Sequence, residues 1–185
     1  MPDLKARIEA LLFASDQPLR FDRLLSLLEA DTESLRNALQ QLQHEYYHPG
    51  RGIVLQEVAG GFQLRTRPEY APWVLKLTRS RALRLSRAAT ETLAVVAYRQ
   101  PITRAEVEYL RGVDSGGVLR ALMEKQLVRC VGKKDVPGRP LLYGTGQKFL
   151  ELFGLKGLSD LPQLSEFAGD EDLALSMELD FDHAE

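Results

Sequence analysis

The stretch IVLQEVAGGFQLRT, residues 53–66, decides the fold of the first half of the chain. Residues 53–58 and 62–66 each have the composition of a short β-strand. Ala59-Gly60-Gly61 lies between them and suits a tight turn, because glycine adopts the backbone angles that such turns need. The stretch therefore predicts a β-hairpin.

Three helices are predicted upstream of this hairpin, because apolar residues recur there at helical spacing. Gln17-Pro18 ends the first helix. Asp31 or Thr32 can cap the third helix, which Pro49-Gly50 ends. Three helices followed by a hairpin is the element order of a winged helix, in which the hairpin is the wing. The apolar positions are Leu4, Ile8, Leu11 and Leu12 in the first helix, Leu24, Leu25, Leu27 and Leu28 in the second, and Leu35, Ala38, Leu39 and Leu42 in the third.

The same order of elements returns 83 residues further along the chain. Asp114 or Ser115 can cap its third helix, and residues 127–131 and 141–145 predict a second hairpin around a longer loop. Chain breakers, caps and core positions coincide between the halves, as a structural repeat requires, although any two helix-turn-helix units would share some of them. The matched pairs include Ala14 with Ala97, Gln17 with Gln100, Pro18 with Pro101, Leu24 with Val107, Asp31 with Asp114 and Leu39 with Leu122.

The predicted fold is therefore α+β and mostly helical, with two tandem winged-helix domains at residues 1–80 and 81–165. Residues 70–86 join the halves, and Trp73, Leu75 and Leu77 predict a packed helix there rather than a loose linker. A hydrophobic content of 44% is enough to fill two small cores.

The single cysteine, Cys130, excludes an intrachain disulfide and a cysteine-based zinc site. It also favours a reducing cytoplasm as the location. No apolar run approaches the roughly 20 residues that cross a bilayer. The charged N-terminus is unlike a signal peptide.

Charge is divided unevenly along the chain. Residues 166–185 contain eight acidic residues and no lysine or arginine, whereas residues 1–165 have a net charge of +6. The acidic tail is typical of a disordered, solvated end. Alternatively, it competes with a polyanion for the basic body of the protein.

Residues 44–48, HEYYH, fit the zinc-protease motif H-E-x-x-H. That chemistry needs both histidines on one helical face and a third ligand, which would have to be a carboxylate such as Glu57 or Glu69. Since Pro49-Gly50 ends the helix, His48 lies in its last turn, and a polar helix end explains these residues better. No Gly-x-Ser-x-Gly or Walker motif is present. We therefore expect a binding protein with no metal, no cofactor and no catalytic residues.

A winged helix commonly reads DNA with its third helix, but both third helices here are nearly neutral. Arg36 stands against Glu33 and Glu45 in the first, and the second opens with an acid and two glycines. A helix that reads the major groove usually has several basic or amide side chains at its start. Lys133 and Lys134 in the second wing could contact phosphates without sequence preference. A DNA-binding regulator remains the alternative function, and we expect direct DNA binding to be weak.

Several longer segments resemble a known family. They are LSRAATETLAVVAYRQPITRAEVEYLRGVD at residues 85–114, VPGRPLLYGT at 136–145, FLELFGL at 149–155, Asp160-Leu161-Pro162, and, more loosely, ALLFA at 10–14 and LRTRPEY at 64–70. The family is segregation and condensation protein B, the accessory subunit of the bacterial SMC condensin. The resemblance covers about residues 4–165, and Gly146 stands where the family usually has a second threonine.

The resemblance implies tandem winged helices that form a homodimer and bind the kleisin subunit, segregation and condensation protein A. The kleisin in turn bridges the SMC ATPase heads. It implies a non-enzymatic adaptor for chromosome condensation and segregation, cytoplasmic and associated with the nucleoid. The cluster Leu24, Leu25, Leu27 and Leu28 also favours a dimer through the first domain, since four leucines so close cannot all face one small core.

We predict that the kleisin binds the second domain near the wing and the final helix, with a further contact on the first domain. Aromatic side chains dominate binding hot spots because they bury a large area with few rotatable bonds. Any single one of them can instead belong to the core. The candidate residues are Tyr98, Tyr109, Arg139, Pro140, Tyr143, Phe149 and Phe153.

Overall fold

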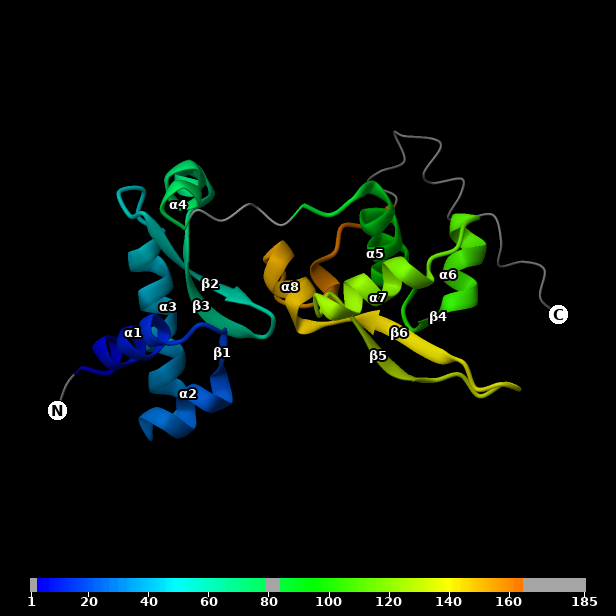
Figure 1. Ribbon diagram of the computed structural model, residues 1–185. Helices are drawn as coiled ribbons and strands as arrows, with labels where there is room; N and C mark the ends of the chain where they lie inside the picture. The colour runs from blue at the N-terminus through cyan, green and yellow to red at the C-terminus, as the bar shows by residue number, and fades with distance from the viewer. Residues whose placement is uncertain (1–2, 79–83, 165–185) are drawn as a thin grey trace. The chain divides into compact units, whose positions relative to one another are not determined.

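The computed structural model describes residues 3–78 and 84–164 (Figure 1). The acidic tail and part of the segment that joins the halves lie outside the described residues. The chain divides into two compact units. One comprises Met1–Arg84 and Gly154–Gly157, and the other comprises Leu85–Phe153 and the residues from Leu158 onward. This division differs from the predicted one because it assigns a short segment of the second half to the first unit.

The first unit has the element order of a winged helix. Its β3 strand lies between β1 and β2, and both pairings are antiparallel. The prediction missed β1 because a strand of two residues has no periodic signal. The elements are α1 (Leu4–Ala14), β1 (Leu19–Arg20), α2 (Phe21–Leu28), α3 (Thr32–Tyr47), β2 (Ile53–Val58), β3 (Gly61–Thr66), the 3₁₀ turn η1 (Pro68–Tyr70) and α4 (Ala71–Thr78).

The hairpin between β2 and β3 turns on two residues. Val58 pairs with Gly61, and the residues between them, Ala59 and Gly60, have φ angles of 51° and 72°. Positive φ at both central positions is typical of the type I′ turn, whose twist matches that of the strands. The amides of Ala59 and Gly60 donate to the carbonyls of Leu155 and Lys156 at 2.8 and 3.0 Å. The segment Gly154–Gly157 thus completes the hydrogen bonding of this turn.

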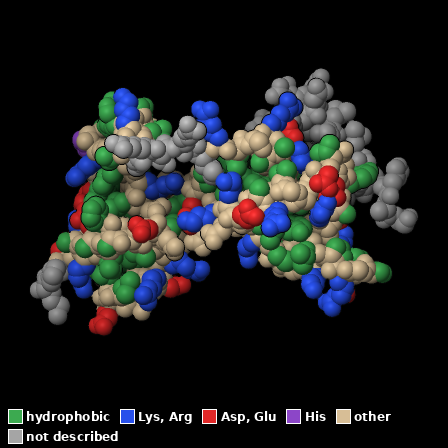
Figure 2. Space-filling view, viewed as in Figure 1, with side chains coloured by type: hydrophobic (Ala, Val, Ile, Leu, Met, Phe, Trp, Pro, Cys, Tyr) green, Lys and Arg blue, Asp and Glu red, His purple; other side chains and the backbone are tan. Residues whose placement is uncertain are grey.

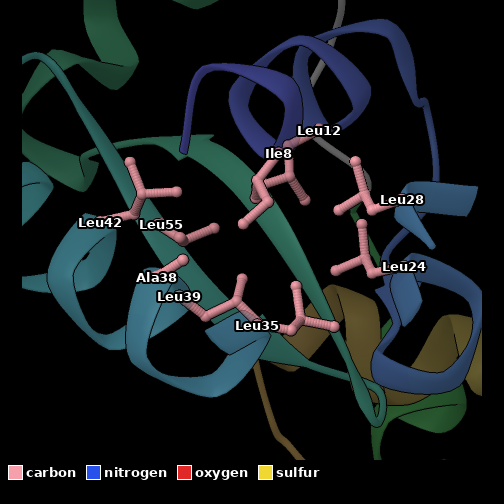
Figure 3. Packing of buried hydrophobic residues seen from close by; sticks show 9 residues of the cluster. All are labelled: Ile8, Leu12, Leu24, Leu28, Leu35, Ala38, Leu39, Leu42 and Leu55. Carbon is pink, nitrogen blue, oxygen red and sulfur yellow. The ribbon is translucent and has the colours of Figure 1, made fainter. Parts of the chain in front are cut away.

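The core of the first unit lies between its three helices and the sheet (Figure 3). Asp31, and not Thr32, caps α3 by accepting a hydrogen bond of 2.8 Å from the amide of Ser34, and this bond holds the pKa of Asp31 below its usual range. Leu24 and Leu28 face the core, whereas Leu27 is exposed. The buried cluster comprises Ile8, Leu12, Leu24, Leu28, Leu35, Ala38, Leu39, Leu42 and Leu55.

The second unit repeats this order, and its sheet has the strand order β4-β6-β5. The two units together make the fold a mixed one of helices and sheets, as predicted. The elements are α5 (Arg87–Arg99), β4 (Ile102–Thr103), α6 (Arg104–Arg111), α7 (Gly116–Glu124), β5 (Val128–Lys133), β6 (Leu141–Thr145), α8 (Gln147–Phe153) and the 3₁₀ turn η2 (Leu158–Asp160). The most deeply buried apolar residues of this unit are Leu93, Val96, Val107, Leu119, Leu122, Leu127 and Val128.

Two local features explain how this unit is built. Thr103 caps α6 in a reciprocal arrangement with Glu106, in which each side chain accepts a hydrogen bond from the other residue's amide. Gly146 precedes α8, and a Cβ atom at that position would lie 2.3 Å from the carbonyl oxygen of Gln126. The glycine that departs from the family pattern is therefore the residue that this backbone requires.

An ionic cluster ties α6 to the start of α7. Arg104 bonds Glu108 at 2.6 Å and Asp114 at 2.7 Å, and the amide of Ser115 donates to Glu108 at 3.1 Å. These bonds, first the one from Arg104, hold the pKa of Glu108 below its usual range. A carboxylate whose pKa is lowered in the folded state stabilises it at pH values above its unfolded pKa, and the stabilisation is lost as pH falls through the folded pKa.

We therefore expect Glu108→Gln to lower the melting temperature at pH 7. The difference from the unmodified protein should shrink as pH falls below the unfolded glutamate pKa of about 4.3. Thermal unfolding followed by circular dichroism between pH 7 and pH 3 measures this. Glu124→Gln, which removes the exposed partner of Arg120, is the matched control and should have almost no effect. A deficit for Glu108→Gln that stays constant down to pH 3 would contradict the role given to the carboxylate.

Candidate partner-binding surfaces

The wing of the second unit brings three of the predicted residues onto one hairpin. Arg139 is exposed on a turn where it has a φ of 41° and its amide donates to the carbonyl of Val136 at 2.9 Å. Pro140 follows, half-buried, and its carbonyl accepts from the amide of Lys134 at 2.9 Å. Tyr143 lies further along β6, also half-buried. The hairpin presents a guanidinium group, a stiff backbone and an aromatic ring in sequence.

Helix α8 separates its two aromatic residues. Phe149 is only 3% exposed, whereas Phe153 is 53% exposed. Their ring centroids lie 4.9 Å apart, so the buried ring supports the exposed one. Phe149 belongs to the core and does not present a contact surface, which is the alternative that the sequence left open for each aromatic. Phe153 is the accessible residue of the pair.

The two remaining tyrosines occupy different positions on the second unit. Tyr98, near the end of α5, is half-buried and its hydroxyl donates to the carbonyl of Pro162 at 3.0 Å. Tyr109 on α6 is 68% exposed. Helices α6 and α8 are well separated in Figure 1, so Tyr109 and Phe153 do not share a single patch. The structure therefore groups the wing residues with each other but leaves Tyr109 on another part of the surface.

A surface that sequence reasoning missed lies on α4. The segment is helical as predicted, but it is not packed as predicted. Trp73 is 64% exposed, Leu77 is 84% exposed, and no residue from Ala71 to Leu77 is buried among the described residues. Trp73 and Leu77 share one face at a spacing of four, while Leu75 points to the opposite side. Apolar residues therefore lie on more than one side of α4, and a helix of that kind is stable only when other protein surfaces bury it. This distribution of apolar residues is the sequence feature that could have predicted a contact surface on α4.

Comparison with known proteins identifies the family. The family model described as segregation and condensation complex subunit ScpB matches residues 6–164. The chain belongs to the ScpB family. Segregation and condensation protein B of Syntrophotalea carbinolica is 58% identical over 180 residues, which cover 97% of this chain and 91% of that protein. The protein of the same name from Moorella thermoacetica is 46% identical over 170 residues, covering 92% and 87%.

Two solved structures of the ScpB family are also similar to this chain. ScpB from Mycobacterium tuberculosis is 38% identical, with 82% of this chain and 95% of that chain covered and a TM-score of 0.39. The second is a dimer of an ScpB N-terminal domain in complex with an ScpA peptide. It is 38% identical, with 40% of this chain and 91% of that chain covered and a TM-score of 0.37.

Two cations of this ScpB-family chain, one on α7 and one in the second wing, are paired with carboxylates. On α7, Arg120 bonds Glu124 at 3.3 Å. In the wing, Lys134 bonds Glu106 at 2.5 Å. Burial raises the pKa of Glu106, but the hydrogen bonds from Lys134 and Thr103 outweigh it and the net pKa is lowered. The side chain of Lys133, which pairs through its backbone with Leu141, has no hydrogen-bond or ion-pair partner among residues 3–78 and 84–164. On the face seen in Figure 2, basic side chains are interspersed with acidic ones.

The HEYYH segment does not have the geometry of a zinc-protease helix. Helix α3 ends at Tyr47, and His48 follows it with extended backbone angles. The carboxylate of Glu45 is bonded by Lys5 at 2.6 Å. Together with Arg51, the segment's polar side chains line a surface cavity of about 490 Å³. The described residues include no group of three side chains that could hold a metal ion, and no described helix is long and apolar enough to span a membrane.

Proposed function

We propose that this chain is a non-enzymatic adaptor that forms a homodimer and binds the kleisin subunit of a bacterial SMC condensin. The kleisin would be segregation and condensation protein A, and it would link the adaptor to the SMC ATPase. The role would be chromosome condensation and segregation during cell division, in the cytoplasm and at the nucleoid. Membership of the ScpB family supports a place in a segregation and condensation complex.

The observation that favours an adaptor is the exposure of large apolar side chains on both units. Trp73 and Leu77 are exposed on the first unit, and Phe153 and Tyr109 on the second. Exposed apolar surface beyond scattered single residues usually marks a contact with another macromolecule. Two separate surfaces suit a protein that must hold both a second copy of itself and a different subunit.

The first unit would supply the homodimer contact through α4. No residue from Ala71 to Leu77 is buried in the described part of the unit, and Trp73 and Leu77 are mostly exposed. A two-fold interface places the same patch of both copies together, so one exposed helix is covered by its symmetry mate or by the surface beside it. Helix α4 would thereby bury in the dimer the residues that the monomer leaves in water.

The second unit would supply the kleisin site along its wing and final helix. Arg139, Pro140 and Tyr143 follow one another on the hairpin, and Phe153 is the exposed aromatic on α8. An aromatic anchor next to an arginine is the composition that binding hot spots favour. Lys133 adds a cation to this wing, so the kleisin segment should combine apolar and acidic residues.

The direct test mixes the purified full chain with the purified kleisin and measures mass by light scattering after gel filtration. We expect a complex that contains two copies of this chain. In a separate binding measurement, DNA should bind only weakly, and its affinity should fall as the salt concentration rises, because phosphate contacts are weakened by salt. Failure to form any complex with the kleisin at micromolar concentration would refute the proposal. Sequence-selective DNA binding at physiological salt would favour the DNA-binding regulator instead.

A further inference from the structure

Strand β5 leaves one side of the second sheet open. The strand order is β4-β6-β5, so β6 has two neighbours and β5 has one within residues 84–164. Five of the six residues of β5, Arg129 to Lys133, are exposed. The amide of Gly146 donates to the carbonyl of Leu127 at 2.9 Å. Since alternate residues of an antiparallel strand bond to the same neighbour, the amide of Cys130 faces the open side.

The positive charge of this open edge favours pairing with an acidic strand. Between Val128 and Thr145 the wing has four basic residues and one acidic residue. An irregularity in the β5–β6 pairing lies between Cys130 and Gly132. Lysines and bulges are devices by which proteins prevent pairing of an edge with another strand. These cations repel another basic strand, but they would attract a strand that has acidic side chains. Val131 and Leu141 add exposed apolar side chains to the same hairpin.

The chain itself contains such a strand sequence in its acidic tail. From Leu173 to Asp182 the sequence is LALSMELDFD, in which every second residue is a large apolar one. Strict alternation places all five apolar side chains on one face of a strand and the acids Glu178, Asp180 and Asp182 on the other. In a helix the same five residues would be divided between two opposite sides. The segment has neither glycine nor proline.

We infer that residues 173–182 add to β5 of the same chain as a fourth, antiparallel or parallel strand of the second sheet. The apolar face would cover Val131 and its neighbours on the hairpin, and the acidic face would lie near Arg129 and Lys133. Eight residues separate the last described residue, 164, from Leu173. Extended chain spans up to about 3.3 Å per residue, so this tether can reach about 26 Å.

The same chain is the expected source of the strand because of its tether. A tether of eight residues gives an effective concentration of about 1 mM or more, far above the micromolar concentration of other copies in a dilute sample. The docked tail would neutralise the wing and close its edge to other strands. Any acidic partner of the wing would then have to displace the tail. Docking of the tail on β5 does not depend on whether the wing binds a kleisin.

Cys130, exposed and the only cysteine of the chain, makes the placement measurable. A second cysteine is introduced at each position from 173 to 182 of the full chain, one at a time, followed by mild oxidation of a dilute sample. Disulfides require Cα atoms within about 7 Å. We expect intramolecular disulfides, read by non-reducing electrophoresis and intact mass, to peak at one tail position and to alternate with a period of two around it.

Two controls separate a docked strand from a loose acidic tail. A tail of the same composition with its alternation scrambled should lose the peak, and so should Leu175→Pro with Leu179→Pro, since proline removes backbone donors. Circular dichroism and thermal unfolding of each variant check that the two units stay folded. Lys133→Glu should slow the cross-link by about tenfold at low salt. Equal yields at every position, disulfides only between chains, or no disulfide would each overturn the inference.

Discussion

Phe153→Ala should weaken kleisin binding by about 30-fold, since an exposed aromatic anchor commonly contributes about 2 kcal/mol. Its effect on thermal unfolding should be small, because the side chain is more than half exposed. Phe149→Ala, four residues earlier on the same helix, is the matched control. Phe149 is 3% exposed, and removing a buried phenylalanine costs about 3–5 kcal/mol of folding free energy. It should therefore lower the melting temperature markedly.

Isothermal titration with purified kleisin, paired with thermal unfolding of every variant, distinguishes the two kinds of residue. The same pair of measurements applies to Arg139→Ala, Pro140→Ala and Tyr143→Ala on the wing. Tyr109→Ala tests the separate surface on α6 and should leave binding unchanged. Normal kleisin binding by every wing and α8 variant that folds would show that the site lies elsewhere. A loss confined to Tyr109→Ala would place it on α6.

The combination of Trp73→Ala and Leu77→Asp should convert the homodimer to a monomer. Each large apolar side chain contributes about 1.5–3 kcal/mol when it is buried, and a two-fold interface contains every residue twice. Two such changes therefore remove about 6 kcal/mol or more from association, while an added aspartate must also be desolvated. Folding should be little affected, because α4 buries none of these side chains within the described first unit.

Light scattering on the full chain at micromolar concentration measures this, with circular dichroism to confirm that the helices remain. Phe13→Ala is the control, since Phe13 is exposed on α1 of the same unit. It removes one large aromatic without touching α4 and should leave the dimer intact. A dimer that survives the α4 changes, or that dissociates with Phe13→Ala alone, would place the interface on another surface.

The sequence predicted what local chemistry determines. Helix order followed from apolar spacing, and the first hairpin from Ala59-Gly60-Gly61. It could not separate Phe149 from Phe153, because residues four apart lie on the same side of a helix. Their different burial depends on how far the core extends along a helix of seven residues. Tertiary packing determines where the core ends along the helix, and the sequence of the helix alone does not show that point.

The exposure of α4 was missed for a related reason. The apolar residues Trp73, Leu75 and Leu77 predict a buried helix. Their apolar character does not show whether the surface that buries them belongs to the same chain or to another one. The two-residue strands β1 and β4 gave no signal either, since their only definition is pairing with β3 and β6. In each case the missing information is the identity of a neighbour distant in sequence.

The first hairpin turn has a consequence for synthesis on the ribosome. Its amide donors, at Ala59 and Gly60, find their acceptors at Leu155 and Lys156, 96 residues later in the chain. Translation proceeds at about 5–20 residues per second, so these donors remain bonded to water for roughly 5–20 seconds after they are made. The nascent first unit can form its leucine core during that interval, but its wing acquires the last backbone partners only when translation has passed the final helix of the second unit.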